Sequence, residues 1–457
     1  MRLAWFTPWP PDPSGIAGRS AELVPMLAAR GHAVDIVVDE TRVPDVCRAG
    51  DDPPAPRQMR VQSAHDFLWR HRRGQYDLTV YQVGNSRLHE YLWPYLWHVP
   101  GLVVLHDARL HHARGRALLS RGRAADYRAE LTWSEPGLAP SAAELAIAGF
   151  DGRYFYQWPM TRAVVESARL VAVHAGGALA ALQERHPDRP ICHIRLGEGL
   201  AVPIGAARRE AARHRLGFAE DAVVFGAFGG LTAERRIHPI LRAFRALRAH
   251  VPGARLLLAG HPDPALDLTA AIGALDLGGV VTLAPGLDDQ AFDEAIAVVD
   301  VSLNLRWPSA LETSGPWLRA LAAGRPTVIV DLPHQAELPA LDPRTWQLHP
   351  PAAHGRRAAD AIATAIDIMD EEHSLRRAMR RLALDADLRA ALGRSGRAYW
   401  EAAHTVGHMA DDYEAAMARA AALPSPAAVL PPHLRPDPMA HAGRLAAPFA
   451  PLSALPR

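Results

Sequence analysis

The chain has 457 residues, a length that exceeds what one hydrophobic core supports, so we expect two or more domains. Its 49% hydrophobic and 22% charged residues are typical of a soluble globular protein. With 50 Lys and Arg against 49 Asp and Glu, the net charge is only +1, which argues against a nucleic-acid partner.

The sequence contains no lysine. This absence excludes chemistry that needs an ε-amine, such as pyridoxal-phosphate Schiff bases and the P-loop lysine. The two cysteines, Cys47 and Cys192, are too few for a disulfide framework or a thiolate zinc site. No stretch approaches the ~20 apolar residues of a membrane span, so we expect a cytoplasmic protein, with transient association with a membrane surface left open.

The first residues indicate a Rossmann-like unit. A short apolar strand, Arg2 to Thr7, is followed by a loop rich in proline and glycine, a helix from about Ser20 to Arg30, and a second strand, Val34 to Val38. Gly15 and Gly18 do not fit G-x-G-x-x-G, so the pattern does not favour nicotinamide binding. Gly15 either serves a tight turn or lies close to a ligand.

Polar residues follow the next predicted strands. Leu102 to Leu105 is followed by His106 and Asp107, at the edge where a Rossmann sheet places its site residues. Together with His111 and His112 they are also candidates for a metal cluster. The spacing lacks H-E-x-x-H and no cysteine supports it, so we expect no metal, with His111 and His112 on a solvated helix.

A second Rossmann-like unit follows a connection that begins near Leu196. The strand Val223 to Phe228 leads into a glycine-bearing loop, a helix, and a further strand, Ala254 to Ala259. The sequence therefore predicts an α/β protein with two Rossmann-like domains that face each other across a cleft, over residues 1–208 and 209–399. Residues 422–457 are rich in proline and are predicted to be a disordered tail.

The stretch from Pro308 to Asp331 predicts an anion site. Gly315 and Pro316 mark the start of a helix between two apolar strands, and Gly324 marks its end. The free N–H groups at such a helix start favour a phosphate-bearing ligand. Glu312 is a good acceptor from hydroxyls, which indicates a sugar beside the phosphate; the alternative is that Glu312 only solvates a loop.

The run that carries this site is L-N-L-R-W-P-S-A-L-E-T-S-G-P-W-L-R-A-L-A-A-G-R-P. It resembles the donor-sugar loop of GT-B glycosyltransferases, specifically retaining family 4, and the S-G-I-A loop and the V-V-L-H-D strand agree with this. The resemblance implies that Glu312 and His106 contact the transferred sugar as catalytic residues. It also implies that Gly15 closes over the donor phosphates. The donor-binding loop then contains Thr313, Ser314 and Gly315.

The same resemblance assigns further donor contacts. Arg235 matches a lysine that holds the donor diphosphate, Arg236 stands where glycine is common, and Gly229 replaces a second cation. Gly286 lies at the nucleobase pocket. Arg319 takes the place of a second glutamate that contacts the ribose, and we expect it in the first helical turn. It either spans the cleft to a carboxylate of the first domain or reaches the nucleotide.

The resemblance implies a glycosyltransferase that retains anomeric configuration and uses a nucleotide-sugar donor. Because Arg235, Arg236 and a helix start would serve the diphosphate, and no D-x-D follows a strand, we expect no metal requirement and no cofactor. Its acceptor is a hydroxyl of a glycan, a lipid-linked sugar or a small molecule, as in polysaccharide biosynthesis. The aromatic segment 115–160 is either a helical insertion that faces the acceptor or an ordinary helical core, and the helix of residues 400–421 returns to the first domain. A GT-B phosphorylase or epimerase, and an inactive nucleotide-sugar-binding partner subunit, are the alternatives.

Overall fold

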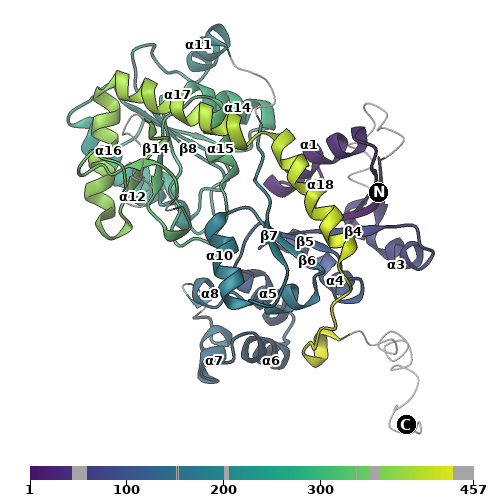
Figure 1. The fold of residues 1–457 in the computed structure, drawn as a ribbon. Coiled ribbons are helices and arrows are strands. Elements are labelled where there is room, and N and C mark those ends of the chain that lie inside the picture. Colours follow the sequence, from purple (N-terminus) through teal and green to yellow (C-terminus); the bar gives the residue numbers. More distant parts are fainter. Residues whose placement is uncertain are drawn as a thin grey trace, which may run out of the picture.

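The computed structural model describes residues 1–43, 59–150, 152, 154–199, 205–335, 337–349 and 360–435 (Figure 1). It contains two α/β domains, each built on a seven-stranded parallel sheet. Cys47 and the end of the predicted tail, residues 436–457, lie outside the described residues.

The first sheet has the strand order β3-β2-β1-β4-β5-β6-β7. Within the described residues its neighbouring strands are all paired in parallel, as expected for a sheet whose crossovers are helices. Its central strands are buried along their whole length, which explains their continuous apolar sequence. The strands are β1 (Arg2–Phe6), β2 (Ala33–Val38), β3 (Met59–Ser63), β4 (Leu78–Val83), β5 (Leu102–Leu105), β6 (Leu170–Val173) and β7 (Ile191–His193).

The second sheet repeats this arrangement with the order β10-β9-β8-β11-β12-β14-β13. Its pairs are parallel as well, so the carboxyl ends of its strands share one edge. The strands are β8 (Val224–Phe228), β9 (Arg255–Ala259), β10 (Val281–Ala284), β11 (Val301–Leu303), β12 (Thr327–Val330), β13 (Ala340–Leu341) and β14 (Ala363–Ile366).

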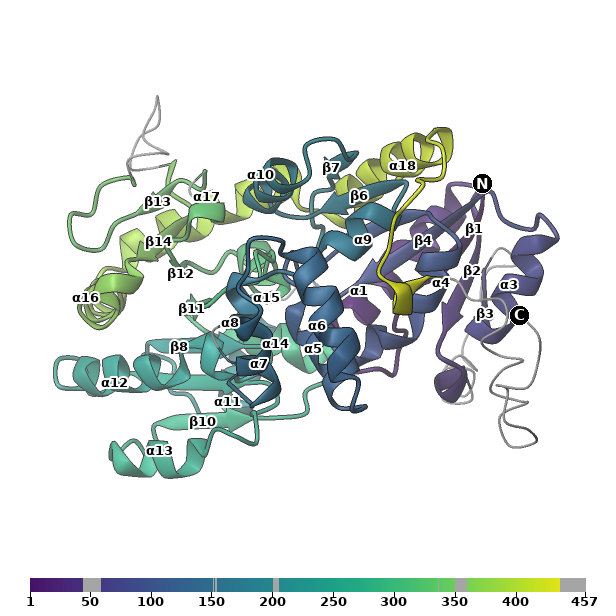
Figure 2. The same ribbon diagram turned by 90° about the horizontal axis from the view of Figure 1, so that it is seen from below.

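Helices cover both faces of each sheet (Figures 1 and 2). In the first domain they are α1 (Gly15–Ala29), α3 (Ala64–Arg72), α4 (Trp93–His98), α5 (His111–Leu119), α6 (Ala124–Ser134), α7 (Ser141–Ile147), α8 (Tyr154–Gln157), α9 (Arg162–Ser167) and α10 (Gly176–Arg185). In the second they are α11 (Ala206–Arg215), α12 (Ile237–Arg248), α13 (Leu268–Ala274), α14 (Asp289–Val298), α15 (Gly315–Ala322), α16 (Glu371–Leu384) and α17 (Ala386–Ala403); α18 (Val406–Ala422) follows.

The segment between β5 and β6 is a helical insertion with its own small core. Tyr127, Leu131 and Phe155 are buried together within α5 to α8. His111 lies inside this insertion, fully buried, 2.7 Å from the hydroxyl of Tyr127 and stacked on Phe155. The prediction that His111 is on a solvated face is therefore wrong, because the insertion folds back over this side of α5.

The domain boundary lies earlier than predicted. Helix α11 packs on the second domain, where Arg208 pairs with Glu294 and Arg209 with Asp300. The predicted division at 208/209 therefore falls inside a helix that packs on the second domain.

The chain returns to the first domain through α18, the yellow helix of Figure 1. Tyr413 of α18 packs on Trp5, and Arg195 makes a bidentate ion pair with Asp412. Helix α18 thus lies against the first domain as the resemblance implied. Within the described residues, no helix is both long and apolar enough to pass through a membrane.

The first part of the predicted tail is ordered. Leu430 and Leu434 are buried against Ala163, and His433 lies 3.0 Å from the carboxylate of Glu130. The prediction of disorder is wrong for residues 423–435 because this apolar pair, the contact of His433 and a hydrogen bond from Arg169 to Ser425 attach the segment to the first domain.

The two domains touch where α10 meets the short helix η4 (Pro333–Gln335). A Cβ atom at Gly177 would lie 2.3 Å from the Cα of His334, whereas one at the neighbouring Gly176 would meet nothing closer than 3.5 Å. Only a glycine at position 177 therefore permits this approach of the two domains.

We expect Gly177→Ala to separate α10 from η4, because the added methyl group would meet backbone and such overpacking costs about 1–3 kcal/mol. Small-angle scattering should show a larger radius of gyration than for the wild type. Gly176→Ala is the matched control, and equal scattering from both variants would contradict the prediction.

Candidate functional site

A cleft of about 710 Å³ lies between the carboxyl ends of the two sheets. The first domain contributes the loop between β1 and α1 and the residues that follow β5 and β6. The second domain contributes the loops after β8, β9, β10 and β11. Ligands of α/β proteins bind at this edge of the sheet, so the cleft is the candidate site.

All but one of the predicted site residues line this cleft. The exception is Arg236, whose guanidinium makes two 2.6 Å contacts with Glu371 and lies over the ring of Trp307. Arg236 has φ of 59°, which directs its side chain away from that of its neighbour. The lining residues are Gly15, His106, Arg235, Gly286, Glu312, Thr313, Ser314, Gly315 and Arg319.

Arg235 is one of three arginines that the second domain presents to the cleft, with Arg306 and Arg319. Its side chain makes no ion pair or hydrogen bond with any residue that the structure describes, and burial, with the nearby Arg306, lowers its pKa to about 9. A Cβ atom at Gly229 would lie 3.0 Å from its guanidinium, so the glycine there makes room for it. An unpaired, partly buried arginine is suited to bind an anion.

The start of α15 lies opposite Arg235. Ser314 is the N-cap and its side chain accepts from the N–H of Trp317, as the sequence predicted for a helix that begins here. Gly315 approaches the first domain closely, because a Cβ atom there would lie 3.1 Å from Arg19 and 3.3 Å from Glu198. The positive end of the helix dipole therefore faces the cleft.

The loop that carries Glu312 is bound to the first domain. The N–H of Ala108 donates to the carbonyl of Ala310 at 2.8 Å, and Oγ1 of Thr313 donates to the carbonyl of His174 at 3.0 Å. Between these bonds Leu311, with φ of 62°, packs on the apolar core of the first domain. A non-glycine residue in this conformation is strained, and the surrounding contacts hold it.

Glu312 is thereby fixed between the domains. Its carboxylate forms an ion pair with Arg306 and accepts from Oγ of Ser309 at 3.0 Å. Burial opposes ionisation of this carboxyl, but Arg306 and the hydrogen bonds hold the pKa of Glu312 below its usual value. The side chain is ionised and can accept hydrogen bonds from hydroxyls.

His106 is held in one tautomer. Its Nε2 lies 2.7 Å from the amide oxygen of Gln82, so Nε2 carries the proton and Nδ1 is an acceptor. Nδ1 is buried without a partner among the described residues. Burial and the neighbouring His174 lower the pKa of His106 well below its usual value, so the ring is neutral and able to accept from a ligand hydroxyl.

A second cavity of about 350 Å³ opens from the cleft toward the insertion. Asp107, at the junction, accepts from the N–H of Asn85 at 2.9 Å, and burial together with the charge of Glu312 raises the pKa of Asp107 to about 6. Seven residues line both cavities: Ser14, Gly15, Ile16, Arg19, Asp107, Arg306 and Glu312.

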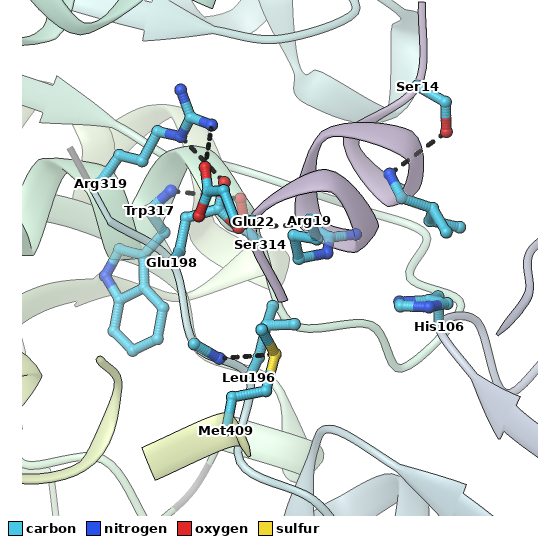
Figure 3. Close-up of polar contacts among 12 residues, drawn as sticks. Ser14, Arg19, Glu22, His106, Leu196, Glu198, Ser314, Trp317, Arg319 and Met409 are labelled. Carbon is cyan, nitrogen blue, oxygen red and sulfur yellow. Dashed lines mark hydrogen bonds and ion pairs between the residues drawn. The ribbon is translucent and has the colours of Figure 1, made fainter. Parts of the chain in front are cut away.

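Sequence reasoning did not single out Arg19 or Arg306. Arg306 follows β11 by a few residues, which is the signal that could have identified it, whereas Arg19 lies inside α1, the helix after the first loop. Arg19, drawn in Figure 3, lies 3.4 Å from Glu198, and its Nε is buried without a partner in the described part of the chain.

Arg319 is the centre of an ion-pair cluster (Figure 3). Its Nε donates to Glu198 at 2.8 Å and its Nη1 to Asp293 at 3.1 Å, and Glu22 and Asp289 lie within 3.7 Å. Burial alone would lower its pKa, but Glu198 and Asp293 hold the pKa of Arg319 above its usual value.

Two roles were predicted for Arg319: a contact with a carboxylate of the first domain, or a contact with the nucleotide. In the structure Arg319 makes the first of these contacts, because Glu22 and Glu198 belong to the first domain. The position on the helix was predicted incorrectly. Arg319 lies in the last turn of α15, where the dipole favours a cation, rather than in the first turn.

The histidines and aspartate considered as a metal site do not form one. Within the described residues no group of three or more His, Cys, Asp or Glu side chains is arranged to hold a metal ion. His112 instead packs edge-on against Phe155 and Tyr156.

Two Rossmann-like domains with the cleft between them define the GT-B fold, which confirms the predicted architecture. Sucrose-phosphate synthase from Thermosynechococcus elongatus is similar, with a TM-score of 0.62 and 16% identity over 91% of this chain and 98% of that one. HepE from Anabaena, solved with UDP and glucose, gives a TM-score of 0.60 and 14% identity over 92% of this chain and 99% of that one.

WaaG, a glycosyltransferase involved in lipopolysaccharide biosynthesis, gives a TM-score of 0.58 and 16% identity over 91% of this chain and 98% of that one. No family model matches the sequence, and no protein of curated function matches it. At these identities the likeness establishes the fold.

We expect Arg319→Ala to lower the free energy of unfolding by about 3–5 kcal/mol, because it removes the central cation that the buried carboxylates of Glu198 and Asp293 share. Denaturant unfolding measures this loss. The double variant Arg319→Met with Glu198→Gln should recover part of it. A loss below about 1 kcal/mol, the range of exposed ion pairs, would show that the cluster does not stabilise the fold.

Glu22 gives the cluster a pH dependence. Burial and the charge of Glu198 raise its pKa to about 7, above the ~4.3 of an unfolded chain. Between these values the folded state binds more protons than the unfolded state, so this carboxyl lowers stability as pH rises from about 4.3 to about 7.

We therefore expect Glu22→Gln to be more stable than the wild type at pH 8 and similar to it at pH 4.5. Thermal unfolding across this range is the measurement. Glu184→Gln, an exposed change on α10, is the control. If Glu22→Gln reproduces the pH profile of the wild type, Glu22 does not titrate in this window.

Proposed function

We propose that the protein is a glycosyltransferase that moves a sugar from a nucleotide-sugar donor to an acceptor hydroxyl with retention of anomeric configuration. One observation carries this proposal: an unpaired arginine and a helix start face the same cleft as two hydroxyl acceptors, Glu312 and His106. HepE, which shares the fold, was solved with UDP and with UDP-glucose, which makes UDP-sugars the first donors to test.

In this proposal the second domain holds the nucleotide. Arg235 and the N–H groups at the start of α15 bind the diphosphate and stabilise the charge that it gains on departure. Gly286, which lies at the cleft with φ of 69°, lets the backbone approach the nucleobase. Because arginine and helix dipole supply the positive charge, we propose that transfer needs no metal ion.

Glu312 and Nδ1 of His106 accept hydrogen bonds from the donor sugar and fix its orientation. The bond from the anomeric carbon to the diphosphate oxygen breaks, and a bond to the acceptor oxygen forms on the same face. The acceptor proton passes to the departing diphosphate. The protein thus supplies position and charge, and no side chain need form a covalent bond.

A second candidate is a nucleotide-sugar-binding subunit without catalytic activity. Arg319, at the place of a second glutamate in the resembling family, is engaged by Glu198 and Asp293. Two hydroxyl acceptors at the cleft, Glu312 and His106, nonetheless favour the enzyme.

Thermal stabilisation by a panel of UDP-, GDP- and TDP-sugars tests donor binding, since a ligand that binds the folded state raises its melting temperature. Slow release of sugar from the stabilising donor supports the enzyme. Binding without release or transfer to any acceptor supports the subunit. The anomeric configuration of the product, read by NMR, tests retention.

Glu312→Gln should lower kcat by two or more orders of magnitude, because hydrogen bonds to an ionised carboxylate that strengthen in the transition state are lost. His106→Ala should lower kcat less, and both should keep the melting temperature of the wild type within a few degrees. Near-normal kinetics of Glu312→Gln would leave the carboxylate with a role in the loop alone.

The neighbouring arginines provide a matched pair for donor binding. Arg235→Ala should raise the donor KM at least about tenfold, because a charge-assisted contact is worth about 1.5–3 kcal/mol. Arg236→Ala should leave the donor KM unchanged while it removes the ion pair with Glu371. A larger KM effect from Arg236→Ala than from Arg235→Ala would reverse the assignment.

A further inference from the structure

We propose that the smaller chamber beside the cleft binds a neutral carbohydrate as the acceptor, with Asp107 accepting a hydrogen bond from the attacking hydroxyl and Tyr156 packing against the sugar ring. This inference rests on the proposed function and names the acceptor of that site. The chamber volume of about 350 Å³ lies within the ordinary range of small-ligand pockets, about 300–1,000 Å³.

The chamber has the chemistry of a carbohydrate site. Its wall is mostly polar, with hydroxyl, amide and carboxylate groups that can exchange hydrogen bonds with several sugar hydroxyls. Ile16, Pro308 and Ala310 are its aliphatic members, too few for the apolar surface that a lipid chain needs. Its polar members include Ser14, Asn85, Ser86, Asp107, Tyr156, Thr232 and Glu234.

Its charges favour a neutral ligand over a phosphorylated one. Arg306 is paired with Glu312, and Arg19 lies against Glu198, so both cations are already compensated. Asp107 and Glu234 have no cation within ion-pair distance among the residues that the structure describes. A phosphate group in the chamber would face these two carboxylates, whereas sugar hydroxyls would donate to them.

Tyr156 comes from α8 of the insertion, which lies beside the second domain (Figure 2). The edge of His112 against its ring, at 4.9 Å between centroids, supports the side chain in place. Thr232, Glu234 and Arg306 of the second domain line the same chamber, so its wall comes from both domains. An aromatic face in this position packs against the C–H face of a pyranose.

Asp107 stands where the chamber meets the cleft. One carboxylate oxygen is engaged by the N–H of Asn85, and the other has no hydrogen bond from any described residue. That oxygen of Asp107 accepts a hydrogen bond from the attacking hydroxyl of the acceptor sugar. The bond orients the hydroxyl so that a lone pair of the hydroxyl oxygen points at the anomeric carbon. As the new glycosidic bond forms and the bond to the diphosphate breaks, the O–H group turns from Asp107 to the departing diphosphate oxygen, which takes up its single proton.

Calorimetric titration of the full chain, saturated with UDP, tests the proposal. The probes are the methyl glycosides of glucose, galactose and mannose, with glucose 6-phosphate and n-octyl glucoside for comparison. We expect at least one methyl glycoside to bind, and Asp107→Asn to weaken its binding about tenfold or more, as for the loss of a charge-assisted contact. Tyr156→Ala, which removes an aromatic ring that packs against the sugar, should also weaken its binding about tenfold.

Tyr154→Ala is the matched control, since Tyr154 lies on the same helix but stacks on Trp158 outside the chamber. Tyr154→Ala should leave the affinity for the methyl glycosides unchanged. Tyr154→Ala, Tyr156→Ala and Asp107→Asn should all bind UDP as the wild type does. Octyl glucoside that binds more tightly than methyl glucoside would support a sugar presented on a lipid, and equal binding a free sugar.

The proposal is overturned if no methyl glycoside binds the UDP-loaded protein, if Tyr156→Ala binds as well as Tyr154→Ala, or if glucose 6-phosphate binds more tightly than every neutral sugar. Failure of UDP and of all nucleotide sugars to bind would instead overturn the proposed function. In that case, titration of the unliganded protein with the same glycosides tests by itself whether the chamber binds a sugar.

Discussion

The arrangement of the two domains depends on one buried cation. Arg319 is surrounded by four carboxylates that come from three places in the chain: α1, the segment after β7, and α14. Removing these charges from water costs several kcal/mol for each ion, so the cluster is favourable only when its geometry is good. That requirement fixes α1 against α15 and places the loop before each helix, with Gly15 on one side and Ser314 on the other.

The contact between the two domains also divides the space between them into a cleft and a smaller chamber. The strained loop at Leu311 brings Glu312 to the boundary between the large cleft and the smaller chamber, and Asp107 lies there from the first domain. A donor and an acceptor in these two spaces would meet at the residues that line both. Polar groups held in place before the ligands arrive need little rearrangement during reaction, which is how preorganised sites lower a barrier.

The elements and the main cleft followed from the sequence because they depend on local patterns. Apolar strands, glycine-bearing loops and the helix start at Ser314 are encoded by neighbouring residues, and they placed Glu312, His106 and Arg235 correctly in the cleft. What could not be predicted depends on distant partners. Glu198 and Arg319 are 121 positions apart in the sequence, and no local sequence pattern predicts a contact between them.

Small backbone differences were equally hidden. Arg235 and Arg236 are indistinguishable as letters, yet the positive φ at Arg236 directs it to Glu371. Leu430 and Leu434 stood in a proline-rich segment without periodicity, so only the apolar surface that they cover reveals that they are ordered. Arg306 stands in a loop after a strand and Arg19 in the helix after the first loop, and neither had a feature that separated it from exposed arginines.

The two points where the chain passes between the domains are bonded to each other. His404, between α17 and α18, accepts from the N–H of Glu198 through its carbonyl and donates to the carbonyl of Leu196 through its ring. The chain segments at Glu198 and His404 are the two connections between the domains, and because they lie side by side they form one pivot. In a rotation about this pivot, atoms far from it move more than atoms close to it. Arg319, bonded to Glu198, lies near this pivot, whereas α8 lies far from it in both views (Figures 1 and 2). A rotation that barely disturbs the buried ion pairs would therefore have to break the contacts that lie farther out, between Ala108 and Ala310 and between Gly177 and His334, before the smaller chamber could widen.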